Sequence, residues 1–242
     1  MNKFLTFREF ETKEDAAEVA ALLGQNNIPT LIEQNRELLD QNIIGRQYNN
    51  YILLKIKGED FEKAQKILIE TTPVDLSKVE KGYMLLSLSN KELMDIIAKP
   101  DEWGAYNYNL ALALLRQRGI NIDERKTEEL QQQHIAELSK QRTLPGHWYL
   151  FGYGFSVLGI AASFYNSKTA LLILYFFYLL PGIFGIILGI IIRYTKRTLP
   201  NGTQIMSYNV NARKHGLYML LVGISSLLFI IIRGIMINEP RL

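Results

Sequence analysis

The polar residues best suited to bind a ligand lie between residues 40 and 50. This stretch contains Asp40, Arg46 and Tyr48 among several amides, and Gly45 gives the backbone freedom to turn. It is long for a connection between two strands, and long polar loops often carry binding residues. A solvated turn without a ligand has the same composition. We take Asp40, Arg46 and Tyr48 as candidate ligand-binding residues.

Catalytic and metal-binding motifs are missing from the sequence. The chain contains no cysteine and three histidines, His134, His147 and His215. None shows the spacing to another histidine or to a carboxylate that is typical of a transition-metal site, and without cysteine there is no thiolate nucleophile. Phosphate-binding loops and the nucleophile elbow of hydrolases are also missing. The sequence therefore predicts no cofactor, no metal and no enzymatic activity.

Charge and hydropathy divide the chain near residue 140. Residues 1–139 hold 17 Lys and Arg against 23 Asp and Glu, whereas residues 140–242 hold 10 against one. The first part has the composition of a soluble arm, and the second contains three long apolar runs. Because the excess basic residues flank these runs, membrane orientation explains them and nucleic acid is not an expected partner.

The apolar runs predict a transmembrane region with three helices over 145–242, with spans at about 147–165, 169–192 and 215–237. Each approaches the ~20 residues that cross a hydrocarbon core of ~30 Å. Seven Lys and Arg flank the spans on one side and at most three on the other. The N-terminus is therefore expected in the cytoplasm and the C-terminus outside, in a multi-pass protein of the bacterial cytoplasmic membrane that contacts the lipid bilayer.

Small residues in the second run indicate where helices approach one another. Gly185 and Gly189 form a GxxxG pair, which lets two helix backbones come close. The pattern does not distinguish packing within one chain from packing between chains, so a homo-oligomer stays open.

The first 70 residues alternate between strand and helix patterns. Strands are predicted at 4–10, 28–33 and 51–57, with one helix over 13–24, capped by Thr12, and another that begins after Gly58. A fourth strand is expected near 74–88. The order β-α-β-β-α, with this added strand, is that of a ferredoxin-like α+β domain over 1–80.

These residues also resemble a known family. The stretch FREFETKEDAAEVAALLGQNNIPTLIEQ, followed after a loop by YILLKIKGEDFEKAQKIL, is similar to the small prokaryotic signal-transducing domain family over roughly residues 4–70. The resemblance implies a ferredoxin-like fold and a role in sensing a ligand or a partner. It brings no catalytic residues.

Residues 81–144 form a predicted helical linker region. Ser89 and Glu92 have the spacing of a capping box at the start of a helix over 90–99, and further helices are expected at 106–118 and 123–141. Trp103 lies between the first two, where packing at a helix corner is the favoured interpretation and a peptide-docking turn the alternative.

A hairpin is predicted between the second and third apolar runs. Pro200-Asn201-Gly202 is a strong turn signal, and residues 203–208 alternate in polarity as a strand does. Because an isolated two-stranded hairpin is only marginally stable in water, ordered strands here would mean that the arm or another chain packs on them.

Two functions fit these features. The first is a membrane-anchored regulatory or sensory adaptor, whose N-terminal domain binds a small ligand or a membrane or cytoplasmic protein partner. The second is a structural accessory subunit of a membrane transport or envelope-assembly complex, in which the arm only docks.

Overall fold

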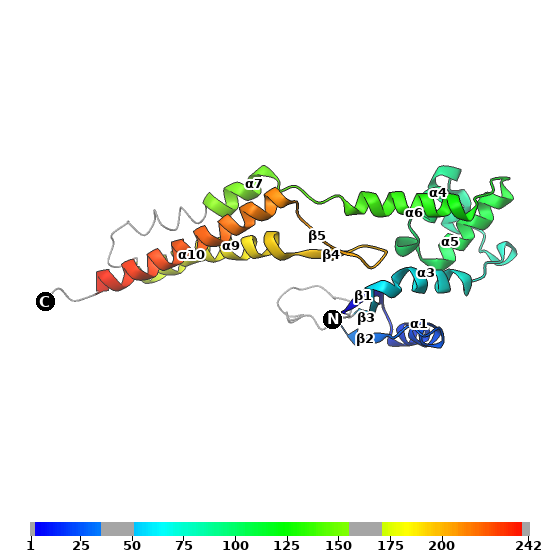
Figure 1. Ribbon diagram of the computed structural model, residues 1–242, viewed down its shortest axis with the longest axis horizontal. Coiled ribbons are helices and arrows are strands. Elements are labelled where there is room, and N and C mark those ends of the chain that lie inside the picture. Colours follow the sequence, from blue (N-terminus) through cyan, green and yellow to red (C-terminus); the bar gives the residue numbers. More distant parts are fainter. Residues whose placement is uncertain (1–2, 35–50, 155–170, 239–242) are drawn as a thin grey trace. The chain divides into compact units, whose positions relative to one another are not determined.

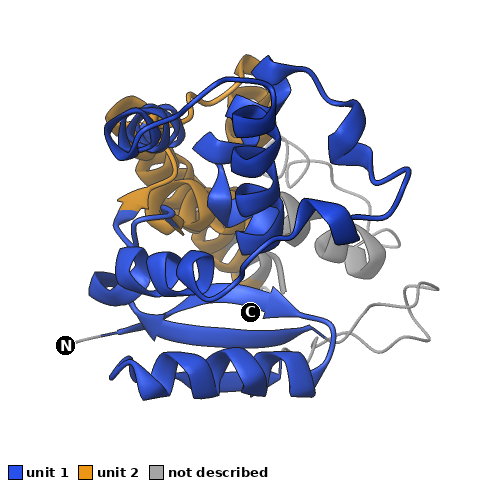
Figure 2. Ribbon diagram, turned by 90° about the vertical axis from the view of Figure 1, so that its right-hand side faces the viewer, with its two compact units in different colours: residues 1–139, 198–204 blue, residues 140–197, 205–242 orange. Residues whose placement is uncertain are grey.

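The computed structural model describes residues 3–34, 51–154 and 171–238. The chain divides into two compact units, which Figure 2 separates by colour. Unit 1 comprises residues 1–139 and 198–204, and unit 2 comprises residues 140–197 and 205–242. The chain therefore enters unit 1 a second time, through one short segment late in the sequence.

In the described residues, the first part of unit 1 contains a three-stranded sheet and two helices (Figure 1). In chain order they are β1 (Phe4–Phe10), α1 (Lys13–Gln25), β2 (Leu31–Gln34), β3 (Ile52–Lys57), the 3-10 turn η1 (Gly58–Asp60) and α3 (Phe61–Glu70). β3 lies between β1 and β2 and is antiparallel to both. The described strands and helices lie close to those predicted, but residues 35–50 between β2 and β3 lie outside the described residues, so the order β-α-β-β-α stays a prediction.

Local sequence explains these boundaries. The Thr12 side chain accepts a hydrogen bond from the Asp15 backbone N–H at 3.1 Å, which starts α1 as the sequence predicts. Ile52, Leu54 and Ile56 alternate along β3 and are buried. Leu54 and Ile56 form one apolar core with residues of α1 and α3, among them Leu23. The register of β1 shifts between Thr6 and Arg8, a bulge that changes the direction of the side chains there.

The predicted fourth strand is wrong, and with it the ferredoxin-like fold class. Residues 74–88 form two 3-10 turns instead, η2 (Leu76–Lys78) and η3 (Met84–Ser87). The Asp75 carboxylate accepts from the Ser77 backbone N–H at 3.0 Å, which favours a turn over an extended strand. Leu85 is fully buried in a helical core rather than on the sheet. Apolar residues in this stretch therefore serve helix packing.

Three helices complete unit 1: α4 (Asn90–Ala98), α5 (Pro100–Gln117) and α6 (Glu124–Ser139). The predicted capping box is confirmed, because Ser89 accepts from the Glu92 backbone and the Glu92 side chain accepts from the Ser89 backbone. Buried leucines and isoleucines of α4 and α5 form a second core. The division of this arm near residue 80 stays a prediction.

The beginning of α5 forms a sharp corner. Gly104 has a φ of 77°, so its backbone leaves the helical conformation between the first turn and the rest of α5. Trp103 packs on the core formed by α4 and α5, which favours the predicted packing role of this corner. The corner fixes where Pro100 and Asp101 point, and both line the cavity described below.

Unit 2 is dominated by two long helices, α9 (Leu171–Tyr194) and α10 (Val210–Asn238), which pack against each other (Figure 1). A short helix, α7 (Gly146–Tyr149), and a π-helical turn, η4 (Leu150–Gly154), precede them. Strands β4 (Lys196–Thr198) and β5 (Gln204–Met206) pair as a hairpin between α9 and α10. This confirms the predicted hairpin.

The prediction of three membrane-spanning helices is wrong. In the described part of the chain, only Val210–Ile232 is long and apolar enough to cross a membrane, and the apolar helical stretch Gly182–Tyr194 is shorter. The predicted first span begins as the short helical turns of α7 and η4, and its remainder lies outside the described residues. One helix, α10, thus meets the physical requirement for a span.

Glycines set the contact between α9 and α10. A Cβ on Gly189 would lie 2.6 Å from the carbonyl oxygen of Gly216, and one on Gly223 would lie 2.7 Å from the carbonyl oxygen of Gly182. The two glycines of each helix are seven residues apart, about two turns, so both pairs fall on one face. The absence of side chains at these positions lets the two backbones approach closely.

Candidate functional site

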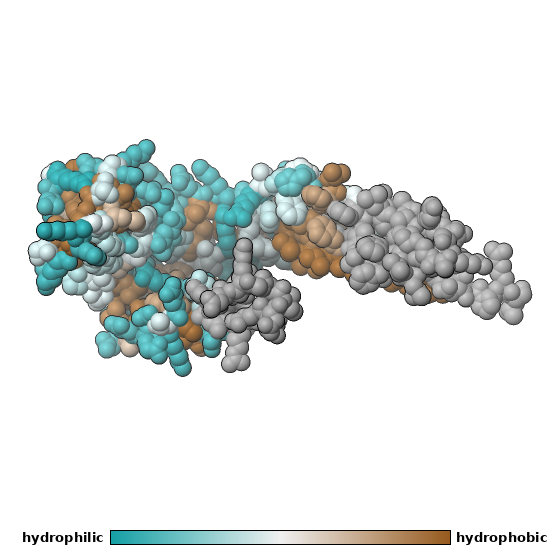
Figure 3. Space-filling view, turned by 180° about the vertical axis from the view of Figure 1, so that it is seen from behind, coloured by the Kyte–Doolittle hydropathy of each residue, from teal (hydrophilic) through white to brown (hydrophobic). Residues whose placement is uncertain are grey.

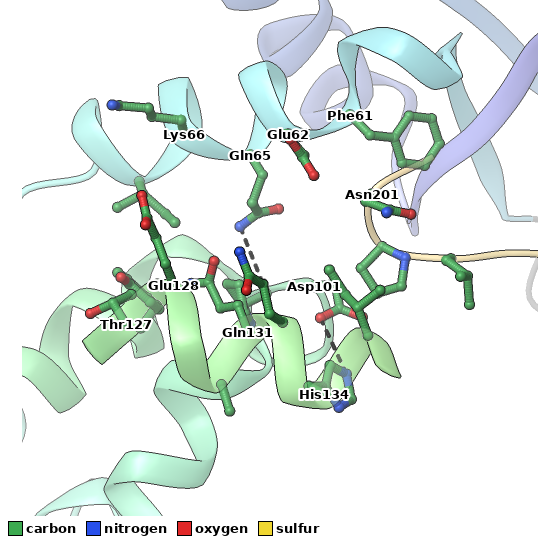
Figure 4. A pocket seen from close by; sticks show the side chains of 18 of the residues that line it. Phe61, Glu62, Gln65, Lys66, Asp101, Thr127, Glu128, Gln131, His134 and Asn201 are labelled. Carbon is green, nitrogen blue, oxygen red and sulfur yellow. Dashed lines mark hydrogen bonds and ion pairs between the residues drawn. The ribbon is translucent and has the colours of Figure 1, made fainter. Parts of the chain in front are cut away.

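A cavity of about 830 Å³ lies in unit 1 (Figure 4). Its walls come mainly from the bulge of β1, from α3, α5 and α6, and from residues 198–201 at the tip of the hairpin. This size is within the range of small-molecule sites. Five carboxylates and three basic side chains line it, so it carries an excess of negative charge.

Side-chain hydrogen bonds to the backbone hold the walls together. Gln65 of α3 accepts from Arg8 at 3.1 Å and donates to the Pro100 carbonyl at 3.3 Å, so it joins β1 to the start of α5. Asn109 of α5 donates to the carbonyls of Ile69 and Thr72, at 2.7 Å each. The two Asn109 bonds use carbonyls in the last turn of α3 and just beyond its end, where the regular helical hydrogen bonds stop. The cavity therefore has a fixed frame.

Arg8 is the basic group at the sheet side of the cavity. Its guanidinium lies 5.6 Å from the centre of the Phe7 ring, and Phe7 in turn packs edge-on against Phe61. Desolvation by burial lowers the pKa of Arg8, and the negative charge of Asp101 acts in the opposite direction. The guanidinium stays charged at neutral pH because its ordinary pKa is so high. It can orient an anionic or carbonyl group of a ligand.

A cluster of one histidine and two carboxylates is formed by α6 and the first turn of α5. His134 of α6 is 7% exposed, and its Nε2 lies 3.7 Å from Asp101 Oδ1 and 3.7 Å from Glu102 Oε1. This nitrogen is buried without a hydrogen-bond partner. In Figure 4 the side chains of Asp101 and His134 point toward one another. Buried polar atoms normally have a partner, so this one requires an explanation.

The tip of the hairpin closes part of the cavity wall. Leu199 is buried, and its N–H donates to the Thr203 carbonyl at 2.9 Å. Gly202 has a φ of 78° and lies directly against Gly58 at the end of β3. A Cβ added to Gly58 would lie 2.7 Å from the Gly202 carbonyl oxygen. The two backbones therefore touch at positions where only glycine fits without a shift.

The sequence-based candidates fall elsewhere. Asp40, Arg46 and Tyr48 lie outside the described residues. Gly185 is buried in α9, and Gly189 lies against Gly216 and Leu220 of α10. The sequence analysis missed the cavity residues, since Arg8, Asp101 and His134 are far apart in the chain. One signal was present: His134 follows the apolar spacing of Leu130 and Leu138, which places it on the packed face of its helix.

Comparison with models of protein families, with curated proteins and with solved structures gives no match for this chain. The resemblance of residues 4–70 to the prokaryotic signal-transducing domain family therefore stays a prediction. Functional inference rests on the geometry of the chain itself.

Proposed function

We propose that the protein is a membrane-anchored regulatory or sensory adaptor, in which α10 holds unit 1 at the membrane and the cavity of unit 1 binds a small ligand. The observation that carries the proposal is that the hairpin between α9 and α10 also supplies part of the cavity wall. Residues 198–201 line the cavity, and the same hairpin joins α9 to α10. Occupation of the cavity therefore acts directly on the segment that connects the long helices.

Support for membrane anchoring comes from the surface of α10. Large apolar side chains are exposed along its length, among them Leu221, Leu228, Ile232 and Ile235. Only 28% of its most apolar window is buried within the protein, and Figure 3 shows apolar surface over the two long helices. Water-exposed apolar surface of this extent is unusual unless lipid or a partner covers it. A lipid bilayer is the expected environment for these side chains.

The short connection between residue 204 and α10 bears on which side of the membrane unit 1 is proposed to lie. Gln204 belongs to unit 1, and α10 begins at Val210. Six peptide steps reach at most about 20 Å, which is less than the ~30 Å of a hydrocarbon core. This short connection supports the proposal that residue 204 and the beginning of α10 are on one side of the bilayer. Arg213 and Lys214 at that beginning favour the cytoplasm, with the C-terminus outside.

The chemistry of the cavity suits a polar small molecule. Arg8 and Gln65 offer donors on one wall, and carboxylates and amides of α6 offer acceptors and donors on the other. The Tyr108 ring, largely buried, adds an apolar surface, and its burial raises the pKa of its hydroxyl. A ligand with both an anionic or carbonyl group and amine or hydroxyl groups fits this lining.

A thermal-shift comparison in detergent tests the proposal. The full-length chain is heated with and without the small-molecule fraction of a cell extract, and Arg8→Met serves as the cavity variant. Lys66→Met is the matched control, since Lys66 also lines the cavity but its side chain is 68% exposed. We expect the fraction to raise the unfolding temperature of the wild type and of Lys66→Met but not that of Arg8→Met.

The accessory-subunit hypothesis gives a different result. In that case no fraction shifts the unfolding temperature, and the chain co-purifies in fixed ratio with other membrane proteins. Equal shifts in the wild type and Arg8→Met would place ligand binding outside the cavity and contradict the proposal.

A further inference from the structure

Three potential metal ligands converge at one wall of unit 1. One oxygen each of Asp101 and Glu102 and Nε2 of His134 all lie within 4.8 Å of one another. The carboxylates come from the first turn of α5, and the imidazole comes from α6. The corner at Gly104 separates that first turn from the rest of α5. Residues up to 33 positions apart in the chain thus present their donors to one point.

The distances suit ligands around an ion better than a direct hydrogen bond. His134 Nε2 is 3.7 Å from an oxygen of each carboxylate. A hydrogen bond between these atoms requires about 2.7–3.2 Å. Ligand atoms at about 2.0–2.2 Å from a tetrahedral Zn²⁺ lie roughly 3.3–3.6 Å from each other. The two carboxylate oxygens lie within 4.8 Å of each other, so rotation of the acidic side chains is needed to bring all three atoms to that geometry.

Burial of His134 distinguishes this cluster from a chance group of exposed acidic side chains. The side chain is 7% exposed, and Nε2 has no hydrogen-bond partner. An imidazole nitrogen in this position costs free energy unless a proton or an ion occupies it. The carboxylates remain accessible, with 31% of the Asp101 side chain and 53% of the Glu102 side chain exposed. An ion therefore has a path to the buried nitrogen.

The basic side chains near Asp101 and Glu102 form hydrogen bonds with other residues and leave these two carboxylates available to a metal ion. Lys99 Nζ donates to Asp95 at 2.8 Å, which holds its ammonium beside α4. The negative charge of Asp101 acts on Arg8, but the Arg8 guanidinium donates its hydrogen bond to Gln65. Within the described residues, no lysine or arginine forms an ion pair with Asp101 or Glu102, whose recorded charged-group contacts are those with His134 at 3.7 Å. The acceptors are thus not saturated by basic side chains.

We propose that Asp101, Glu102 and His134 bind a divalent transition-metal ion, with Zn²⁺ as the best match to one imidazole and two carboxylates. Asp101 and His134 both line the cavity, so the remaining coordination position faces it. Water or a donor atom of a cavity ligand completes the coordination. The site depends on unit 1 alone and holds whether or not α10 spans a membrane.

Direct metal titration of the full-length chain in detergent tests the site. The protein is stripped with a chelator, and Zn²⁺ is titrated in competition with a chromophoric indicator. We expect one Zn²⁺ per chain with a Kd below about 10 μM, and at least about tenfold weaker binding for His134→Gln, Asp101→Asn and Glu102→Gln. Co²⁺ in place of Zn²⁺ is expected to give visible absorption bands that the three variants lose.

Two control variants separate this site from general binding. His147→Gln removes a histidine of unit 2, and Glu129→Gln removes an exposed carboxylate of α6 outside the cluster. Both should bind Zn²⁺ as the wild type does. Circular dichroism checks the fold of each variant; if His134→Gln unfolds, the two exposed carboxylate variants decide. Absence of stoichiometric Zn²⁺ binding, or unchanged affinity in Asp101→Asn and Glu102→Gln, overturns the proposal.

Discussion

Replacement of Gly58 by alanine should release the hairpin tip from unit 1. The new Cβ would lie 2.7 Å from the carbonyl oxygen of Gly202 and 3.3 Å from a methyl carbon of Leu5. The leucine side chain can rotate away, but the Gly202 carbonyl belongs to the backbone of the turn. Gly58 has no positive φ, so the substitution has a steric effect and no conformational one.

The magnitude follows from overpacking. A Cβ at 2.7 Å is short of normal contact, so the two backbones must separate by about half an ångström or more, and such insertions typically cost about 1–3 kcal/mol. If this cost falls entirely on the contact between the hairpin tip and Gly58, the population of the open hairpin rises about 5–150-fold, since 1.4 kcal/mol corresponds to a factor of ten. Most of this opening should appear locally rather than as unfolding of unit 1.

Trypsin cleavage after Lys196 and Arg197 measures this opening. Both residues lie in β4, and cleavage requires the strand to leave the hairpin. In detergent, Gly58→Ala should be cleaved there at least about fivefold faster than the wild type. Gly24→Ala is the control, since its Cβ would meet no atom within 4 Å. Equal cleavage rates for Gly58→Ala and Gly24→Ala would refute the contact between Gly58 and the hairpin tip.

Three further predictions concern unit 1. Leu115→Ala should lower the free energy of unfolding by about 2–5 kcal/mol, because Leu115 is fully buried between helices, whereas the same change at the exposed Met84 should have a small effect in chemical denaturation. Gly202→Ala should accelerate cleavage at Arg197 more than Gly58→Ala does, since it adds a positive φ of 78° to the steric overlap. Hydrogen bonds from Ser89 lower the pKa of Glu92 below its ordinary 4.5, so its stabilisation is present above pH 4.5 and is lost as the pH falls through the lowered pKa. Thermal unfolding of Glu92→Gln should therefore differ from the wild type at neutral pH and converge with it in acid.

Local signals in the sequence predicted the elements of the fold well. Thr12 with Asp15 and Ser89 with Glu92 are complete capping signals within four residues, and both helices begin as predicted. Pro200-Asn201-Gly202 likewise contains what a turn requires, including a glycine at the position of positive φ. These features depend on short segments, so a single sequence suffices.

Features that depend on distant residues could not be predicted in the same way. The pattern at 74–88 is apolar enough for a strand, but its leucines pack on α4 and α5, which lie later in the chain. Similarly, Asp101 and Glu102 read as ordinary acidic residues in a first turn, and only the fold brings His134 to them. Hydropathy alone identified three apolar runs, but the described helices of unit 2 differ in length and only one meets the requirement for a span.

The most direct test of membrane anchoring uses single cysteines, because the chain has none of its own. Glu80→Cys in unit 1, Thr203→Cys at the hairpin tip and Leu242→Cys beyond α10 are expressed separately in a bacterium. A membrane-impermeant maleimide is then added to intact spheroplasts. The account predicts that Leu242→Cys is labelled from outside, whereas Glu80→Cys and Thr203→Cys react only after lysis. Labelling of Thr203→Cys and Leu242→Cys from the same side would show that α10 does not cross the membrane, and would contradict the account.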